Sequence, residues 1–453
     1  MSTERRSVEA RWFIRGEAGI PRSLSVRSKT KCLVVGTLFL VSIIGPGAYA
    51  QNQPDFARVQ DAPFTSPITP RYERVGPLSI HAQPDFLSHP ELPMGAVAGA
   101  QVFPGALANV ISVSNFQSSF FSRGKTWPFT MIGHAPALGG TTAVPTRIIT
   151  VTLELQNADL VTTTKVSVLP FVTPTLDSPN FKVANYTSGQ QIQFADAVQR
   201  AEFFHHMKAS WHTELFPTGV VDHLVIRVPR FVTATVNGVK TQVRTYFTTT
   251  SSNGKTVVLL LDSFFNQQIF NVVVKEIGAN RFRTNAMNMA LFPNTFLFSL
   301  NSSGGLGACC VLGFHTFFTN GATPKESRWI FAFASWISPG VFGGGFVDVT
   351  ALSHEISEAV DDPFVDNAVP AWQFPNSPGS CQDNLETGDP IEVLANASVP
   401  IKTAGQVFHP QTEALLQWFE QKSTSDALGG AFSYPDTKAL KHSATPFGPL
   451  TCR

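Results

Sequence analysis

Charged residues are scarce in this chain. Asp, Glu, Lys and Arg together make up 14% of its 453 residues, and 33 basic side chains nearly balance 32 acidic ones. A protein that holds nucleic acid through charge needs a basic excess, which this chain lacks. We therefore expect no nucleic-acid partner. The 43% of hydrophobic residues is enough for a substantial buried core.

Long apolar stretches are also missing. The stretch at residues 32–44 is too short to cross a bilayer, which takes about 20 residues, and no later uncharged stretch reaches that length. We expect no transmembrane segment. Basic residues at 27–31 precede this stretch, and Ala48-Tyr49-Ala50 follows it, a pattern that signal peptidase cleaves. The sequence thus predicts a signal peptide over residues 1–50, cleavage after Ala50, and a secreted or periplasmic protein. An internal translation start would place residues 1–23 outside the protein.

Cysteine is rare, with five residues in the whole chain. Removal of the signal peptide leaves Cys309, Cys310, Cys381 and Cys452, and an even number in an exported chain favours two disulfides. Adjacent cysteines pair poorly with each other, because a disulfide needs its Cα atoms several ångströms apart. We therefore expect Cys309 and Cys310 to pair with Cys381 and Cys452, in either order. A free buried thiol at one of the adjacent positions is the alternative.

The chain that remains divides into two parts. Residues 51–145 are rich in Pro, Gly, Ser and Ala, which predicts an extended, loop-rich arm that a protease could use as a propeptide. Residues 146–453 alternate strands with few helices, which favours an α+β domain with a mixed twisted sheet. The expected strands are residues 147–156, 163–171, 223–236, 242–250, 256–261, 268–275, 295–300, 310–318 and 328–337. A helix is expected at residues 194–215. We assign its three histidines to the surface rather than to a metal: His205, His206 and His212.

The most informative motif is His354-Glu355-Ile356-Ser357-Glu358, an H-E-x-x-E sequence. Residues four apart share one face of a helix, so His354 and Glu358 can present a ring nitrogen and a carboxylate to one metal ion. Glu355 lies beside them, where it can activate a metal-bound water. This is the arrangement of the zincin helix, whose second ligand is usually histidine.

The helix that carries the motif has recognisable limits. A Gly-rich turn at residues 340–345 precedes it, Asp348 or Thr350 is the expected N-cap, and Pro363 ends it. Its remaining apolar residues fall on the face opposite the motif, where they can pack on the sheet: Leu352, Ile356, Ala359 and Val360. The alternative interpretation of the same segment is a solvated acidic helix without a metal site.

A zinc site needs a third protein ligand beyond the helix. We expect it from Asp389, with Glu386 as the alternative and with His315 or His409 as weaker candidates. Trp372 lies between the helix and this segment, and we expect it to pack over the helix end rather than to stack on a substrate.

Several ordered motifs together resemble a known family. They are Cys309-Cys310 with Gly313 and His315, the segment Leu352–Glu358, Asp362-Pro363-Phe364, Pro370 with Trp372, and Cys381 with Leu385, Glu386, Gly388, Asp389 and Pro390. This set is similar to a family of secreted bacterial zincin-like proteins and, more distantly, to the plant phosphate-induced (EXORDIUM-like) secreted proteins, in which the histidine–glutamate pair is often absent. The resemblance spans residues 140–453 and implies a zincin-like fold and an extracytoplasmic location. The chain departs from proven zincin peptidases because Glu358 replaces the second histidine. One His and two carboxylates make a harder site, so Ca²⁺ and Mn²⁺ stand beside Zn²⁺ as occupants.

Two functions compete on this basis. The first is a secreted zinc metallopeptidase-like hydrolase that cleaves an extracellular polypeptide, with His354, Glu358 and Asp389 as ligands and Glu355 as the base. Its substrate would lie along residues 328–337 as an added strand at a sheet edge. The second is a non-catalytic extracellular structural or binding protein on a zincin-like scaffold. Carbohydrate binding by the β-rich middle is a third class, based on composition alone.

Overall fold

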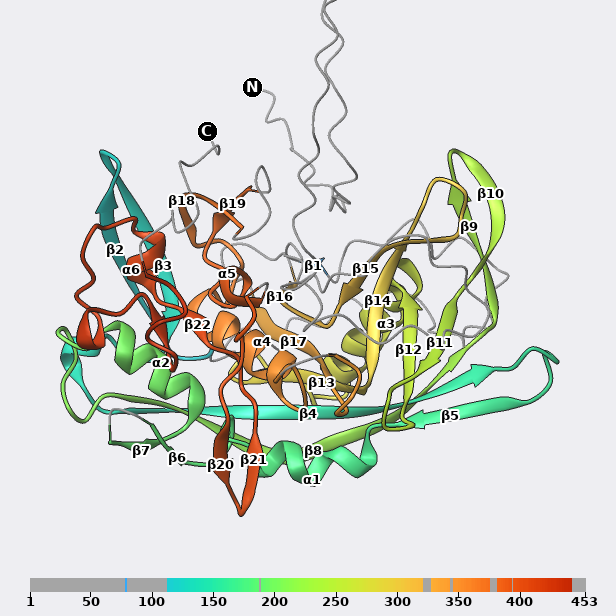
Figure 1. The fold of residues 1–453 in the computed structure, drawn as a ribbon, viewed down its shortest axis with the longest axis horizontal. Helices are drawn as coiled ribbons and strands as arrows, with labels where there is room; N and C mark the ends of the chain where they lie inside the picture. Colours follow the sequence, from blue (N-terminus) through green and yellow to red (C-terminus); the bar gives the residue numbers. More distant parts are fainter. Residues whose placement is uncertain are drawn as a thin grey trace, which may run out of the picture.

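The computed structural model describes residues 78–79, 112–186, 189–320, 327–342, 345–374, 381–392 and 394–441. The fold is mixed α+β and rich in strands, in agreement with the expected class (Figure 1). No helix in these described segments has the length and apolar character to span a bilayer. The predicted signal peptide and most of the predicted arm lie outside the described residues.

A seven-stranded mixed sheet forms the centre of the molecule. Its order is β1 (Leu78–Ser79), β16 (Gly313–Thr319), β17 (Arg328–Trp336), β13 (Met287–Pro293), β4 (Thr141–Gln156) and β5 (Thr163–Ser167), and β8 (His212–Val228) pairs with the other side of β4. The strand β17 lies between β16 and β13 and pairs with both. The expectation that residues 328–337 form a substrate-binding edge is therefore wrong, because both sides of β17 already carry ladder hydrogen bonds.

A second, four-stranded sheet continues from the first. Its order is β11 (Tyr246–Thr250), β12 (Thr256–Leu261), β14 (Thr295–Leu300) and β15 (Leu306–Val311). The chain passes from β13 to β14 through Asn294, whose φ is 38° and whose side-chain amide donates to Thr256 O and Ser338 Oγ. It returns from β15 to β16 through Leu312. Two one-residue connections, at Asn294 and Leu312, thus join strands of the second sheet directly to strands of the central sheet.

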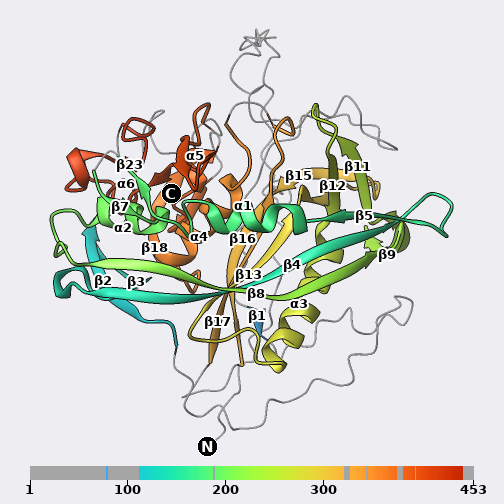
Figure 2. The same ribbon diagram turned by 90° about the horizontal axis from the view of Figure 1, so that it is seen from below.

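The remaining strands form two-stranded pairs outside these two sheets. They are β2 (Asn115–Ser122) with β3 (Lys125–Ile132), β6 (Ala184–Asn185) with β7 (Gln191–Ile192), β9 (Phe231–Val236) with β10 (Val239–Arg244), β18 (Ala368–Gln373) with β19 (Cys381–Asn384), β20 (Ile401–Thr403) with β21 (Gln406–Phe408), and β22 (Glu413–Ala414) with β23 (Ser433–Tyr434). The hairpins β2–β3 and β9–β10 lie at opposite ends of the long strands β4 and β8 (Figures 1 and 2). A hairpin thus stands at residues 115–132, where the sequence predicted loops.

Six α-helices lie in the described segments: α1 (Val172–Asp177), α2 (Phe194–Glu202), α3 (Asp262–Gly278), α4 (Thr350–Asp361), α5 (Asp389–Glu392) and α6 (Leu416–Phe419). The strand predicted at residues 268–275 is wrong, because this segment belongs to α3. Its run of valines has high β-propensity, but Phe265, Ile269, Val273 and Ile277 recur every four residues and are all buried. The helix predicted at residues 194–215 ends early, since β8 begins at His212.

The helices α3 and α4 cover opposite faces of the central sheet. Alternate residues of a strand point to opposite faces, and β17 follows this rule. Phe331 and Phe333 belong to the core that includes Phe265 of α3, whereas Ala332 and Ala334 belong to the core that includes Ile356 of α4. The small residues on the α4 side let this helix approach the sheet closely. The apolar face expected for α4 is confirmed.

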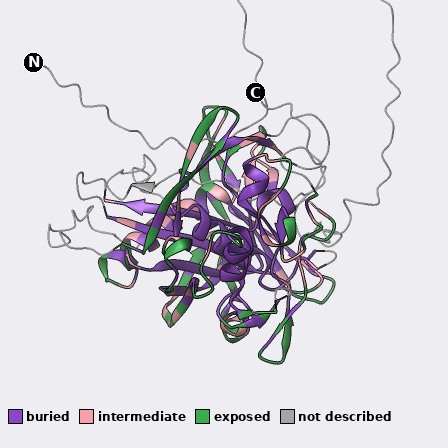
Figure 3. Cartoon of the chain, turned by 90° about the vertical axis from the view of Figure 1, so that its left-hand side faces the viewer, coloured by how far each residue is buried: buried purple, intermediate pink, exposed green. Residues whose placement is uncertain are grey.

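Buried residues fill the centre of the molecule, and exposed ones gather on the outer hairpins (Figure 3). Every residue of α4 is buried, including the polar ones. A buried polar group costs free energy unless it finds a partner. Other parts of the chain therefore have to supply partners for the polar side chains of α4.

The cysteine pairing differs from the expected one. Cys309 and Cys310 form a disulfide with each other, across a cis peptide bond, with their Cα atoms 3.0 Å apart. The prediction that they bridge to Cys381 and Cys452 is wrong, because it took the Cα atoms of adjacent cysteines to be too close together for a disulfide. Cys381 is also disulfide-bonded, and Cys452 lies outside the described residues.

Candidate metal centre

The helix α4 supplies three of the site residues. His354 and Glu358 lie one turn apart, and His354 Nε2 is 3.0 Å from Glu358 Oε1. Glu355 points into the same space, between the helix and β16. All three side chains are at most 2% exposed. The expected sharing of one helix face by His354 and Glu358 is confirmed.

The start of α4 differs in detail from the prediction. Its N-cap is Val349, which makes no side-chain cap, rather than Asp348 or Thr350. Asp348 instead accepts from the ring of His409, at 2.8 Å from Nδ1, and from its backbone N–H. These hydrogen bonds hold His409 beside the N-terminal end of α4. Among the described residues, neither group that could hold a metal ion includes it.

The strand β16 places His315 opposite the helix. His315 pairs with Ala332 across the ladder, so its side chain lies on the α4 side of the sheet. Its Nδ1 is 3.3 Å from Glu358 Oε2 and 3.8 Å from Glu355 Oε2. A Cβ added at Gly313 would come within 2.5 Å of Glu355 Oε1, so only glycine leaves room for this carboxylate. His315 was a weak candidate from the sequence, and the structure brings it into the site.

The segment after β19 closes the site from the other side. The N–H of Gly388 donates to Glu358 Oε1 at 3.0 Å, and a Cβ at Gly388 would overlap the ring of His354. Asp389 Oδ1 lies 3.7 Å from His354 Nε2, while its Oδ2 accepts from Gln382 Nε2 at 2.6 Å. Both sequence candidates from this segment reach the site, since Glu386 Oε2 lies 3.8 Å from His315 Nδ1.

These residues form two overlapping groups that could hold a metal ion: His354, Glu358 and Asp389, and His315, Glu355 and Glu358. Within each group the potential ligand atoms lie within 4.8 Å of one another. The first group is the ligand set proposed from the sequence. Imidazole and carboxylate ligands suit zinc and manganese, and the donor set alone does not choose between them.

The carboxylates of the site outnumber its imidazoles. Burial raises the pKa of Glu355 to about 7, although His315 and His354 partly oppose this. Burial would also raise the pKa of Glu358, but the same two imidazoles outweigh it and hold that pKa below its ordinary value. Burial lowers the pKa of both imidazoles, and the surrounding carboxylates more than offset this. Glu358 is therefore the carboxylate that is ionised most readily in the metal-free protein.

The other carboxylates retain protons more strongly. Burial, reinforced by the charge of Glu358, raises the pKa values of Glu386, Asp389 and Glu413 well above their ordinary range. Neither oxygen of Glu355 or of Glu413 has a hydrogen-bond partner among the described residues. Buried carboxylates of this kind are normally paired with cations or bound to metals. A cation held by either group would reduce the repulsion among these carboxylates, so the residues fit a metal ion.

Three supporting residues had no signal in the sequence. Glu413 on β22 adds a buried carboxylate, and Gln382 holds Asp389 in place. Gln411 donates from its amide to Gly388 O at 2.7 Å and from its backbone to Ser353 Oγ at 2.8 Å. None stands at a ligand spacing from the motif, because the fold brings them together from separate loops.

Trp372 packs against two aromatic residues of α6, and its predicted packing over the end of α4 stays a prediction. It is fully buried, with its ring 5.6 Å from that of Trp418 and 5.7 Å from that of Phe419. Its Nε1 donates to Asn384 O at 2.9 Å, which ties β18 to β19 near the site. It therefore supports the loop that carries Asp389.

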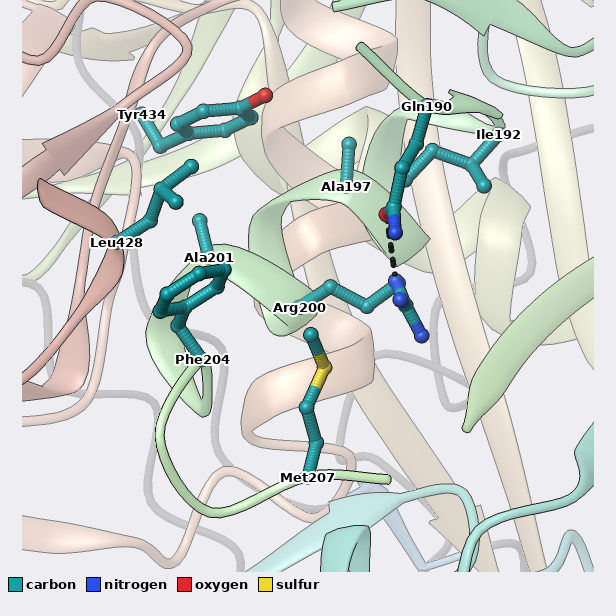
Figure 4. Close-up of a pocket in the computed structure, with 9 residues that line it drawn as sticks. All are labelled: Gln190, Ile192, Ala197, Arg200, Ala201, Phe204, Met207, Leu428 and Tyr434. Atoms are coloured by element: carbon teal, nitrogen blue, oxygen red, sulfur yellow. Dashed lines mark hydrogen bonds between the residues drawn. The ribbon is translucent and has the colours of Figure 1, made fainter. Parts of the chain in front are cut away.

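The histidines of the residue 194–215 segment do not join the metal groups. His206 is exposed and binds Asp426 at 3.0 Å, and His212 Nδ1 lies 2.7 Å from Asp196 Oδ2. A pocket of about 140 Å³ does lie against α2 (Figure 4). It is lined by Gln190, Ile192, Ala197, Arg200, Ala201, Phe204, Met207, Leu428 and Tyr434. Its one charged group, Arg200, donates to Gln190 and to Trp211 O.

Comparisons of the chain with models of protein families, with curated proteins and with solved structures gave no match. The family resemblance described from the motifs therefore stays a prediction.

Proposed function

We propose that this protein is a secreted metal-dependent hydrolase with a zincin-like site. His354, Glu358 and Asp389 would hold a zinc ion, and Glu355 would be the base. The observation that carries this proposal is the position of Glu355. Its carboxylate is buried beside the first metal group, has no hydrogen-bond partner among the described residues, and has a pKa near 7. A general base works best when its pKa lies near the working pH.

Hydrogen bonds from neighbouring residues orient two of the proposed ligands, Glu358 and Asp389. The N–H of Gly388 fixes Glu358 Oε1 on the side of His354, and Gln382 fixes Asp389 Oδ2, which leaves Oδ1 directed toward His354. Such outer hydrogen bonds orient ligands and tune their basicity. A bound zinc ion would polarise a substrate carbonyl and lower the pKa of water. Glu355 would then accept the proton of the attacking water at its carboxylate. The proposed substrate is an extracellular polypeptide.

A second candidate function is a non-catalytic extracellular scaffold braced by the metal. The observation that favours it is burial: the residues of both metal groups are at most 2% exposed. A catalytic zinc keeps one position open for water and substrate, whereas a structural zinc is closed. The same residues would then stabilise the domain without turnover.

Metal analysis combined with one isosteric variant separates these functions. The purified protein, Glu355→Gln and His354→Ala are compared for zinc content and for cleavage of a peptide library. The hydrolase proposal expects about one or more zinc ions per chain, their loss or reduction in His354→Ala, and cleavage that Glu355→Gln abolishes while it retains zinc. Zinc without cleavage in any protein would support the scaffold, and cleavage by Glu355→Gln would remove Glu355 as the base.

A further inference from the structure

The carboxylate of Glu358 faces two imidazoles rather than one. Its Oε1 lies 3.0 Å from His354 Nε2, and its Oε2 lies 3.3 Å from His315 Nδ1. A carboxylate that presents its two oxygens to ligands on different sides can bridge two metal ions, which in such sites are about 3.5–4 Å apart. The proposed zinc site uses only the side of His354.

The other side has the features of a second cation site. His315, Glu355 and Glu358 bring their ligand atoms within 4.8 Å of one another, and Glu386 Oε2 lies 3.8 Å from His315 Nδ1. The Glu355 side chain is fully buried and has neither oxygen hydrogen-bonded among the described residues. Gly313 keeps the space between β16 and Glu355 open. Three carboxylates and one imidazole converge here, so the site would favour a divalent cation such as Zn²⁺ or Mn²⁺.

We propose that the protein binds a second divalent cation through His315, Glu355 and Glu358, and that this ion inhibits hydrolysis. The inhibitory part rests on the proposed function, because it takes Glu355 as the base. A carboxylate oxygen that donates its lone pair to a cation no longer accepts a proton from water. The first group has both of its carboxylates positioned by hydrogen bonds from Gly388 and Gln382, and it therefore fills first. Excess metal then occupies the second group and removes the base.

The number of bound ions tests the second site without reference to activity. Chelator-stripped protein is titrated with ZnCl₂ by calorimetry, and bound zinc is counted after gel filtration. We expect two ions per chain for the wild type, one for His315→Gln, and two for His206→Ala, which removes an exposed histidine away from the site. A wild type that saturates at one ion overturns the second site and leaves the proposed hydrolase intact. A wild type that binds none overturns both.

Manganese gives a measurement that does not depend on any variant. Two Mn²⁺ ions that share a carboxylate are magnetically coupled, so the electron paramagnetic resonance spectrum of the loaded wild type should change from six lines to a coupled multiline pattern as the second equivalent binds. A six-line spectrum that only grows in intensity would overturn the bridging role of Glu358.

The inhibitory role is tested by the rate of peptide cleavage at increasing zinc concentration. The rate should rise as the first ion binds and fall as the second one binds. His315→Gln should shift the inhibiting concentration upward by tenfold or more, and His206→Ala should leave it in place. A rate that stays constant while the second ion binds would overturn the inhibition.

Discussion

The free energy of unfolding of the metal-free protein should fall as the pH rises, and Glu355→Gln should remove a defined part of this fall. The pKa of Glu355 is raised from an ordinary 4.5 to about 7 by burial. Between these two values the folded protein binds a proton that the unfolded chain has released, so stability decreases with increasing pH. One pKa unit corresponds to about 1.36 kcal/mol, so the ionised Glu355 costs about 3 kcal/mol at pH 8.

Glutamine has the shape of the protonated acid and does not ionise. In chelator we therefore expect Glu355→Gln and the wild type to agree within about 1 kcal/mol at pH 5. At pH 8 the variant should be more stable by about 3 kcal/mol. The assay is urea unfolding at pH 5, 6, 7 and 8, followed by tryptophan fluorescence. Glu214→Gln, which removes a carboxylate of β8 outside the site, is the matched control.

A difference between Glu355→Gln and the wild type that stays constant from pH 5 to pH 8 would refute this reasoning. It would mean that Glu355 ionises in the folded protein as it does in the unfolded chain. The assignment of Glu355 as a base that works near neutral pH would fall with it.

Other perturbations have equally direct outcomes. Gly388→Ala adds a methyl group that overlaps the ring of His354, so it should lower the unfolding free energy by about 1–3 kcal/mol and reduce bound zinc, both measured on one preparation. Trp372→Ala should cost about 3–5 kcal/mol in urea unfolding, because it empties a fully buried indole site. Asn288→Ala removes a buried amide that donates to Ile330 O at 2.8 Å, and should cost about 1–3 kcal/mol in the same assay. Chelation should lower the melting temperature more at pH 8 than at pH 5, because fewer site carboxylates are protonated at pH 8 and more negative charge is left unbalanced when the ion is removed; an equal effect would contradict this.

The local part of the site could be predicted from the sequence. The H-E-x-x-E spacing specifies a shared helix face by geometry alone, and Pro363 marks the helix end. The place of His315 in the site could not be predicted in the same way. Its contact with Glu358 depends on the β16–β17 register and on the direction of alternation in β16, neither of which a ligand spacing reveals.

The errors in the fold predicted from the sequence also have physical causes. The valines of α3 have strong β-propensity, and burial at four-residue intervals decided in favour of the helix. The position of β17 in the interior of the sheet depends on which strands pair over long distances in the chain, and pattern alone does not contain this information. The loop-rich composition of residues 51–145 likewise hid the hairpin at residues 115–132, whose strands alternate only weakly.

Segments that follow α4 in the chain complete the proposed metal site, so uptake of the proposed ion would have an order. His354 and Glu358 are made well before Asp389 and Glu413, so a partly synthesised or partly exported chain has an incomplete set of ligands. A chain exported in an unfolded state would therefore bind the proposed ion after transport is complete, from the metal pool of the destination compartment rather than from that of the cytoplasm.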